Sequence, residues 1–400
     1  MKNEVNKHYT NLKSLTKSRG LIGTLFPSKY KFSPYRACQH GCKYCDGRAE
    51  RYYVEGDFEK DIVIRDNIPQ LLDEELSKIR ELGIISIGSG VSDSYQPVEA
   101  GEKIMEGAAR VLAKYNLPVN IMTKSDLALR DIDIWEKIHR KSGVTIMVSL
   151  TFVDDELRQI FEPGASSVEE RLNLLREFKK RGLYAGVLAM PFIPYISDNK
   201  ENMFGLLKKL EEIGVDFIIP GSMTLRPGKQ KELFMEVVRD KFPRLMGKFK
   251  NLYRKNLRSG ISLYSYRQEL HKRIDDVFGQ FSIPNHVPHH LYRNQFPLYD
   301  EVYILLSHMQ ELYSKRGIDI SPLEESLKKY TRWLKKEKKI FNRKRSMDYR
   351  ELEQKLLFLI YSEELDNLLQ NDKMSQFIKD VVIERRTFDY VNLKLLEKED

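Results

Sequence analysis

The chain has 400 residues, which predicts one large domain plus a second unit, and its 41% hydrophobic residues suffice for a sizeable buried core. The N-terminus lacks the apolar run of a signal peptide, and no stretch approaches the roughly 18 apolar residues of a transmembrane helix, which excludes the membrane-spanning classes. Three cysteines exclude a disulfide framework, so we expect a cytoplasmic protein with no membrane partner.

The formal net charge of +9 is unevenly distributed along the chain. Residues 241–350 hold 24 lysines and arginines against 11 acidic residues, whereas the rest of the chain is close to neutral. A basic region of this kind predicts a partner that carries phosphates, although solubility alone would also account for it.

Short apolar runs alternate with amphipathic ones from residue 29 to about 225. The pattern predicts six strands, at 29–34, 84–88, 118–123, 144–150, 183–190 and 215–220. Five helices are expected between them, near 67–82, 97–115, 131–142, 167–181 and 199–213. Such alternation predicts parallel βα units with right-handed crossovers. The fold class is therefore α/β, with a partial parallel (β/α)6 barrel as the simplest closure and a doubly wound open sheet as the alternative.

The alternation stops after residue 230, and the remainder reads as a mostly helical, basic C-terminal region. We therefore divide the chain into an N-terminal extension (1–28), the partial barrel (29–230) and the C-terminal region (231–400). Residues 241–258 interleave lysine and arginine with aromatic and aliphatic residues. This pattern fits an amphipathic helix with snorkelling cations, or a nucleic-acid surface that combines charge with stacking.

All three cysteines lie in one stretch, CQHGCKYC, as Cys38, Cys42 and Cys45. A structural zinc site would need a histidine as fourth ligand, either His40 or one from the HVPHH loop at 286–290. A redox pair would use only two of the thiols. A [4Fe–4S] cluster usually takes four thiolates, so three would leave one iron open to another ligand.

The CxxxCxxC spacing, the aromatic Tyr44 before the last cysteine and the position after the first predicted strand together resemble the radical S-adenosylmethionine (SAM) superfamily. Further stretches resemble its spore photoproduct lyase-related group, often labelled DNA repair photolyase-like. These stretches are SDSYQPVE (92–99), TKS (123–125), VSLT (148–151), FEPGASSVEERL (161–172) and AMPFIP (189–194).

The resemblance implies a [4Fe–4S] cluster on the three cysteines, whose open iron binds SAM. It implies reductive cleavage of SAM to a 5′-deoxyadenosyl radical, with an electron from a reductant such as flavodoxin or ferredoxin. It also implies contacts from five residues to the cofactor. These are Lys124 to its carboxylate, Ser92 near its amino group, Ser149 to its ribose, Tyr44 to its adenine or the cluster, and the backbone of Ala189 to its adenine.

The chain departs from spore photoproduct lyases at one position. Those enzymes carry a hydrogen-donating cysteine after the second strand, where this chain reads Gly90-Val91-Ser92. Thymine-dimer repair by that route is therefore doubtful, and Tyr95 is our candidate for a catalytic relay. Three functions stay open: a radical enzyme acting on nucleic acid, a radical enzyme acting on a small molecule or protein, and a non-catalytic protein stabilised by zinc or a cluster.

Overall fold

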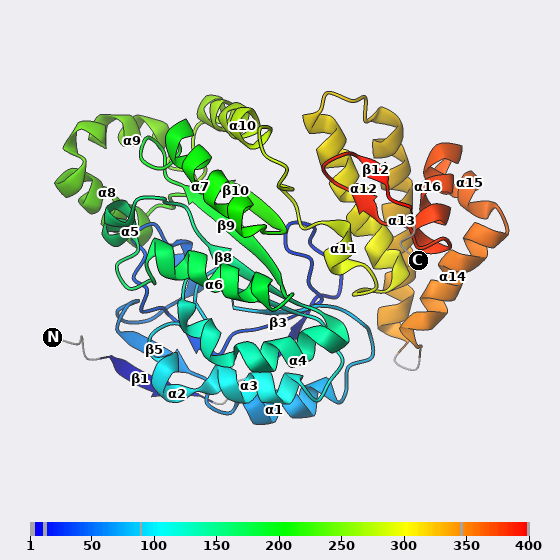
Figure 1. Cartoon of the computed structure of the whole chain (residues 1–400), viewed down its shortest axis with the longest axis horizontal. Helices are drawn as coiled ribbons and strands as arrows, with labels where there is room; N and C mark the ends of the chain where they lie inside the picture. The colour runs from blue at the N-terminus through cyan, green and yellow to red at the C-terminus, as the bar shows by residue number, and fades with distance from the viewer. Residues whose placement is uncertain (1–4, 11–13, 89, 345–346, 398–400) are drawn as a thin grey trace.

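A computed structural model describes residues 5–10, 14–88, 90–344 and 347–397 (Figure 1). Its main sheet has the strand order β10-β9-β8-β7-β6-β3-β2, and all neighbours are parallel except β2 (Thr16–Lys17) with β3. The six parallel strands are β3 (Tyr30–Phe32), β6 (Ile85–Ile87), β7 (Val119–Thr123), β8 (Val144–Ser149), β9 (Tyr184–Phe192) and β10 (Phe217–Ser222). Each lies where the sequence predicts it, and the linear order leaves the barrel open. The predicted α/β partial barrel is thus confirmed.

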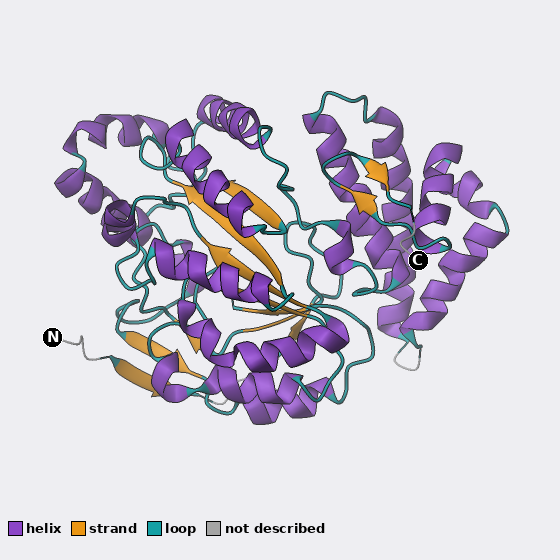
Figure 2. Ribbon diagram, viewed as in Figure 1, coloured by secondary structure: helices purple, strands orange, loops and turns teal. Residues whose placement is uncertain are grey.

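Helices between the strands cover the outer side of the sheet (Figure 2). They are α1 (Ile68–Leu76), α2 (Glu99–Glu102), α3 (Ile104–Leu112), α4 (Ile132–Ser142), α5 (Asp155–Phe161), α6 (Val168–Lys180) and α7 (Lys200–Ile213). A capping box at the start of α6 is formed by Ser167 and Glu170. The short helix α5 was not predicted, because its seven residues read as part of a loop.

A second, small sheet was also missed. It contains β1 (Asn6–Tyr9), β5 (Asp61–Ile64) and β4 (Tyr35–Arg36), so the N-terminal extension pairs with a segment far away in the sequence. Strands of two to four residues carry too little periodicity to be recognised. Residues 1–4 and 11–13 of the extension lie outside the described residues.

Side chains along the parallel strands alternate between two hydrophobic cores. In β8, Val144, Ile146 and Val148 belong to the core shared with the covering helices, whereas Met147 belongs to a second core shared with the C-terminal helices. We call this second face the inner face. Ser149 continues the register of Met147 and therefore lies on the inner face.

The C-terminal region divides between the two cores. Helices α8 (Lys229–Lys241), α9 (Met246–Leu252) and α10 (Tyr264–Phe278) add side chains to the first core. The second core contains residues of α11 (His289–Tyr292), α12 (Leu298–Lys315), α13 (Ser321–Arg343), α14 (Tyr349–Tyr361), α15 (Glu364–Leu369), α16 (Asp372–Val382) and the hairpin β11 (Phe388–Asp389) and β12 (Lys394–Leu395). Figure 1 shows α8 and α9 at one end of the sheet and the α12–α16 bundle at the other. The domain limits at residues 28 and 230 stay predictions.

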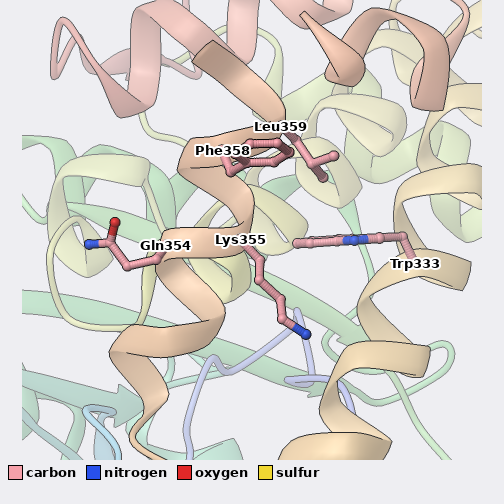
Figure 3. Close-up of a pocket in the computed structure, with 5 residues that line it drawn as sticks. All are labelled: Trp333, Gln354, Lys355, Phe358 and Leu359. Carbon is pink, nitrogen blue, oxygen red and sulfur yellow. The ribbon is translucent and has the colours of Figure 1, made fainter. Parts of the chain in front are cut away.

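The basic run at 335–345 lies largely on α13, and residue 345 is outside the described residues. A cavity of about 530 Å³ opens between α13 and α14, where Trp333 faces Phe358 and Leu359 (Figure 3). No helix among the described residues is long and apolar enough to cross a bilayer.

A buried ionic network joins the bundle to the sheet. Lys338 of α13 donates to Asp300 of α12 at 2.7 Å. Lys29, which precedes β3, donates at 2.8 Å to Glu81, which precedes β6. Tyr299 connects the two pairs by donating to Glu81 at 3.2 Å. Burial lowers the pKa of Lys338 and raises the pKa of Asp300, which shows that each charge depends on its partner.

We expect Lys338→Met to lower the free energy of unfolding by about 3–5 kcal/mol, because it leaves the Asp300 carboxylate buried without its cation. Urea denaturation of the full chain measures the loss. Lys339→Met, one position along the same helix and exposed, is the matched control and should change stability by less than about 0.5 kcal/mol. Equal effects of the two substitutions would contradict a stabilising role for the network.

Candidate active site

The cysteine loop begins directly after β4, at the carboxyl end of the first parallel strand. Ala37 (φ 68°) and Gly41 (φ 62°) of this loop have positive φ. Glycine adopts this left-handed conformation without strain. All three thiols are free of disulfide bonds. Cys38 and Cys42 are buried, and Cys45 is partly exposed.

Two glutamines fix the backbone of this loop. The side-chain oxygen of Gln96 accepts from the amide of Gln39 at 2.8 Å, and its nitrogen donates to the carbonyl of Ala37 at 3.3 Å. In return, the side chain of Gln39 accepts from the amide of Val98 at 2.6 Å. The loop after β6 therefore fixes the backbone of the cysteine loop.

The loop between α5 and α6 packs against the other side of the cysteine loop. The amide of Gly164 donates to the carbonyl of His40 at 3.0 Å, and the amide of Lys43 donates to the carbonyl of Phe161 at 2.8 Å. A Cβ atom on Gly164 would lie 2.3 Å from the carbonyl oxygen of Gln39, so only glycine allows this approach. The FEPGAS stretch (161–166) therefore supports the backbone of the cysteine loop, and we call it the support loop.

Asp93 is a buried hub between β6 and β7. Its carboxylate accepts from the hydroxyl of Thr123 at 2.8 Å and from the amides of Lys124 and Tyr95 at 2.7 and 2.8 Å. The Nε2 atom of His40 lies 3.1 Å away. Burial alone would raise the pKa of Asp93, but His40 and the two amides outweigh it and hold this pKa below its usual value.

Lys124 follows β7 and continues the register of the inner-face residue Met122. Burial acts to lower the pKa of Lys124, but its electrostatic interactions with Cys42, Glu162 and Cys45 outweigh burial, so the pKa is raised. The ammonium group makes no hydrogen bond or ion pair within the part of the chain that the structure describes. It is therefore a cation beside two of the three thiols, with donors available to an anionic ligand.

Glu162 and Arg171 form a fully buried ion pair at 2.5 Å. Glu162 also accepts from the hydroxyl of Tyr44, which fixes that ring beside the cysteines. Arg171 donates to the carbonyls of Ser149 at 2.7 Å and Ser166 at 2.9 Å. Burial would raise the pKa of Glu162, but Arg171 and Lys124 lower it.

The remaining predicted cofactor contacts lie at the carboxyl ends of strands. Ser149 ends β8 on the inner face. Ala189 is buried in β9, and its side chain lies in the core shared with the covering helices, so only its backbone could meet a ligand. The hydroxyl of Ser92 donates to the carbonyl of Tyr35 at 2.9 Å and lies 2.9 Å from the hydroxyl of Ser33. These contacts tie Ser92 to the start of the cysteine loop.

Tyr95, the predicted catalytic residue, is fully buried. Its hydroxyl donates to Asp131 at 3.0 Å and accepts from the indole of Trp135 at 3.0 Å, both on the α4 side of the sheet. These contacts place Tyr95 in the core that the sheet shares with the covering helices, where its ring packs. Its catalytic role stays a prediction that the geometry does not support.

Three of the histidines considered as zinc ligands, His40, His286 and His289, are engaged elsewhere. His40 pairs with the carbonyl of Gly164 at 2.9 Å as well as with Asp93. In the C-terminal region, His286 pairs with Glu311 and His289 with Glu301, both at 2.9 Å. Across the described ranges, no three His, Cys, Asp or Glu side chains converge on a point that could hold one metal ion.

The three thiols suit a cluster in which each sulfur binds a different iron. Burial raises the pKa of Cys38, of Cys42 to about 12 and of Cys45, so the thiols are protonated when no metal is bound. Metal binding displaces these protons and supplies the compensating charge. Lys124 adds a fixed cation next to two of them, so the donor set fits an iron–sulfur cluster.

Residues of the segment after β10 also hold the cysteine loop, and sequence reasoning missed them. The side chain of Gln230 donates to the carbonyl of Tyr44 at 2.9 Å, and the side chain of Arg226 donates to Asp46 at 2.6 Å. No local spacing relates these residues to a loop about 180 positions earlier. Only the barrel topology brings them together.

Residues 32–207 match the family model of the Radical SAM superfamily. This match agrees with the resemblance that the cysteine spacing carries. Among curated proteins it is similar to the uncharacterized protein Rv2578c of Mycobacterium tuberculosis (strain ATCC 25618 / H37Rv), with 28% identity over 64% of this chain and 76% of that protein. It is also similar to the uncharacterized protein MJ0683 of Methanocaldococcus jannaschii, with 30% identity over 43% of this chain and 63% of that protein.

The chain is also similar to solved structures. A spore photoproduct lyase complexed with dinucleoside spore photoproduct aligns over 69% of this chain and 79% of its own, with a TM-score of 0.49 and 15% identity. Streptococcus suis SuiB bound to S-adenosylmethionine aligns over 62% of this chain and 47% of its own, with a TM-score of 0.40 and 12% identity.

We expect Gly164→Ala to reduce the iron content of the anaerobically reconstituted chain, because the added methyl group pushes the support loop away from Gln39. Iron and sulfide analysis measures the loss, and urea denaturation reports whether the whole fold is affected. Gly101→Ala is the matched control, since no heavy atom lies within 4 Å of its Cβ position. If Gly164→Ala loads as much iron as Gly101→Ala, the support loop does not position the cysteines.

Proposed function

We propose that this protein is a radical SAM enzyme in which Cys38, Cys42 and Cys45 hold a [4Fe–4S] cluster with one open iron for SAM. One observation carries the proposal: three thiols without disulfide bonds share one loop, and the ammonium of Lys124 beside two of them makes no hydrogen bond or ion pair with other described residues. When bound, the reduced cluster supplies the electron that cleaves SAM and so generates the radical that abstracts hydrogen from the substrate.

The residues around the loop would bind and orient the cofactor. Lys124 offers a point charge and three donors to the carboxylate of SAM. The hydroxyl of Ser149 makes no hydrogen bond in the described part of the chain and lies on the same inner face, where it suits a ribose. Tyr44, held by Glu162, presents a fixed ring beside the cysteines.

Nucleic acid is the substrate class that we favour. The basic C-terminal segment supports it, because α8 follows Arg226, which is paired with Asp46 of the cysteine loop, and Gln230 of α8 bonds to Tyr44. The segment thus starts on the same side of the barrel as the thiols. A small molecule or protein substrate is the alternative. With every cysteine in the cluster loop, the chain has no further thiol to return hydrogen.

The reaction also needs an electron donor. A low-potential carrier such as flavodoxin or ferredoxin is the partner that we propose, because one-electron reduction of the cluster must precede cleavage of SAM.

The proposal is tested by anaerobic reconstitution with iron and sulfide, followed by reduction and addition of SAM. We expect four irons per chain, and formation of 5′-deoxyadenosine and methionine. A chain that instead binds one zinc ion tightly and leaves SAM intact would refute the proposal. Addition of single-stranded DNA or RNA then shows whether nucleic acid accelerates cleavage.

We expect Lys124→Met to weaken SAM binding by about tenfold or more, because it removes a charge-assisted contact to the carboxylate. The dissociation constant of SAM, measured on the reconstituted chain, reports the change, and iron content should stay that of the wild type. Lys141→Met, at the exposed end of α4, is the control and should bind SAM normally. Unaltered affinity in Lys124→Met would remove this lysine from the cofactor site.

A further inference from the structure

A cavity of about 970 Å³ opens beside the cysteine loop, and its wall begins four residues after Cys45. One side is the turn that follows the cysteines. The other side comes from the segment after β10 and from the exposed turn that ends the basic stretch. The lining residues are Ala49, Glu50, Arg51, Tyr53, Arg226, Pro227, Asn256, Arg258 and Ser259.

Three arginines from three separate segments line this cavity. Arg226 is anchored by Asp46 at 2.6 Å and by the carbonyl of Arg258 at 3.0 Å. Arg51 and Arg258 are exposed, and neither side chain makes an ion pair or hydrogen bond with other described residues. Asp46 is paired with Arg226 and does not line the cavity. Glu50 is therefore the one carboxylate among the lining residues. The cavity therefore carries excess positive charge in a form suited to tetrahedral oxyanions.

The cavity is built rigidly against the cysteine loop. Arg36, two residues before Cys38, donates to the carbonyls of Tyr52 and Tyr53 at 2.6 and 2.7 Å. This clamp holds Tyr53 in a left-handed conformation (φ 49°) with 80% of its surface exposed. On the opposite wall, Lys231 fixes Asn256 by a hydrogen bond of 2.8 Å. The Arg51 guanidinium lies over the ring of Tyr52, 5.1 Å from its centroid, and leaves its hydrogen-bond donors available. An exposed aromatic ring beside such guanidinium groups is the arrangement that binds the phosphate of a nucleotide and stacks on the base.

We propose that this cavity is the subsite that binds a phosphate ester of the substrate and so places the substrate at the mouth of the cysteine loop. The inference rests on the proposed function and narrows its substrate class to phosphorylated molecules. A mononucleotide and a nucleic-acid strand share this chemistry, and the size of the cavity suits one nucleotide unit.

The test uses the full reconstituted chain and a fluorescein-labelled single-stranded oligothymidylate, with binding followed by fluorescence anisotropy. We expect Arg51→Gln/Arg258→Gln to bind at least about tenfold more weakly than the wild type. A plot of the logarithm of the association constant against the logarithm of the salt concentration should become shallower by about 1.4, because two phosphate contacts to a single strand are lost. Urea denaturation confirms that both variants are folded.

Lys335→Gln/Lys339→Gln is the matched control. Both lysines line another basic cavity, on α13 in the C-terminal bundle, and the variant loses the same charge. It should bind the probe as the wild type does. No binding of the probe at low salt, or equal losses in the two double variants, would overturn the inference.

Competition identifies the source of the phosphate. Thymidine should not displace the probe. Displacement by thymidine monophosphate as effective as that by unlabelled oligothymidylate indicates a mononucleotide, whereas displacement by the oligonucleotide alone indicates a strand. Displacement by thymidine would overturn the inference. A chain that cleaves SAM but binds no phosphorylated probe refutes this subsite alone, and one that binds the probe but leaves SAM intact refutes the proposed function alone.

Discussion

The buried ion pair between Arg171 and Glu162 connects four of the segments that form the candidate site. Through it the start of α6 is tied to the end of β8, to the support loop and to Tyr44 of the cysteine loop. Two charges held away from water are stable only while both partners and their remaining hydrogen-bond donors stay in place. The pair therefore fixes one arrangement of these segments, and the thiols take their positions from it.

Charge balance around this pair accounts for the chemistry of the site. Arg171 neutralises Glu162, and His40 faces Asp93 in the neighbouring loop. Lys124 is left as a cation whose natural counterparts are thiolates and an anionic ligand. The carboxylate of SAM beside the cluster would satisfy it, which is why this residue suits cofactor recognition.

The sequence predicts much of this fold because parallel strands and their helices carry strong local patterns. All six strands were found, and the periodicity of β8 correctly placed Ser149 at the carboxyl end of the sheet. What it missed depends on contacts between distant segments. The small β1-β5-β4 sheet, the bond from Gln230 to Tyr44 and the clamp of Arg36 leave no local signal. Tyr95 follows a strand in sequence, yet its ring turns toward α4, a choice that spacing alone does not reveal.

We propose that three cysteines leave one iron of a cluster open to SAM. This proposal is tested most directly by electron paramagnetic resonance of the reduced, reconstituted chain, recorded before and after addition of SAM labelled with a magnetic nitrogen isotope at its amino group. Direct binding to the open iron predicts a changed spectrum with hyperfine coupling to the labelled nitrogen. A cluster signal that SAM leaves unchanged, with no coupling to the label, would contradict the account.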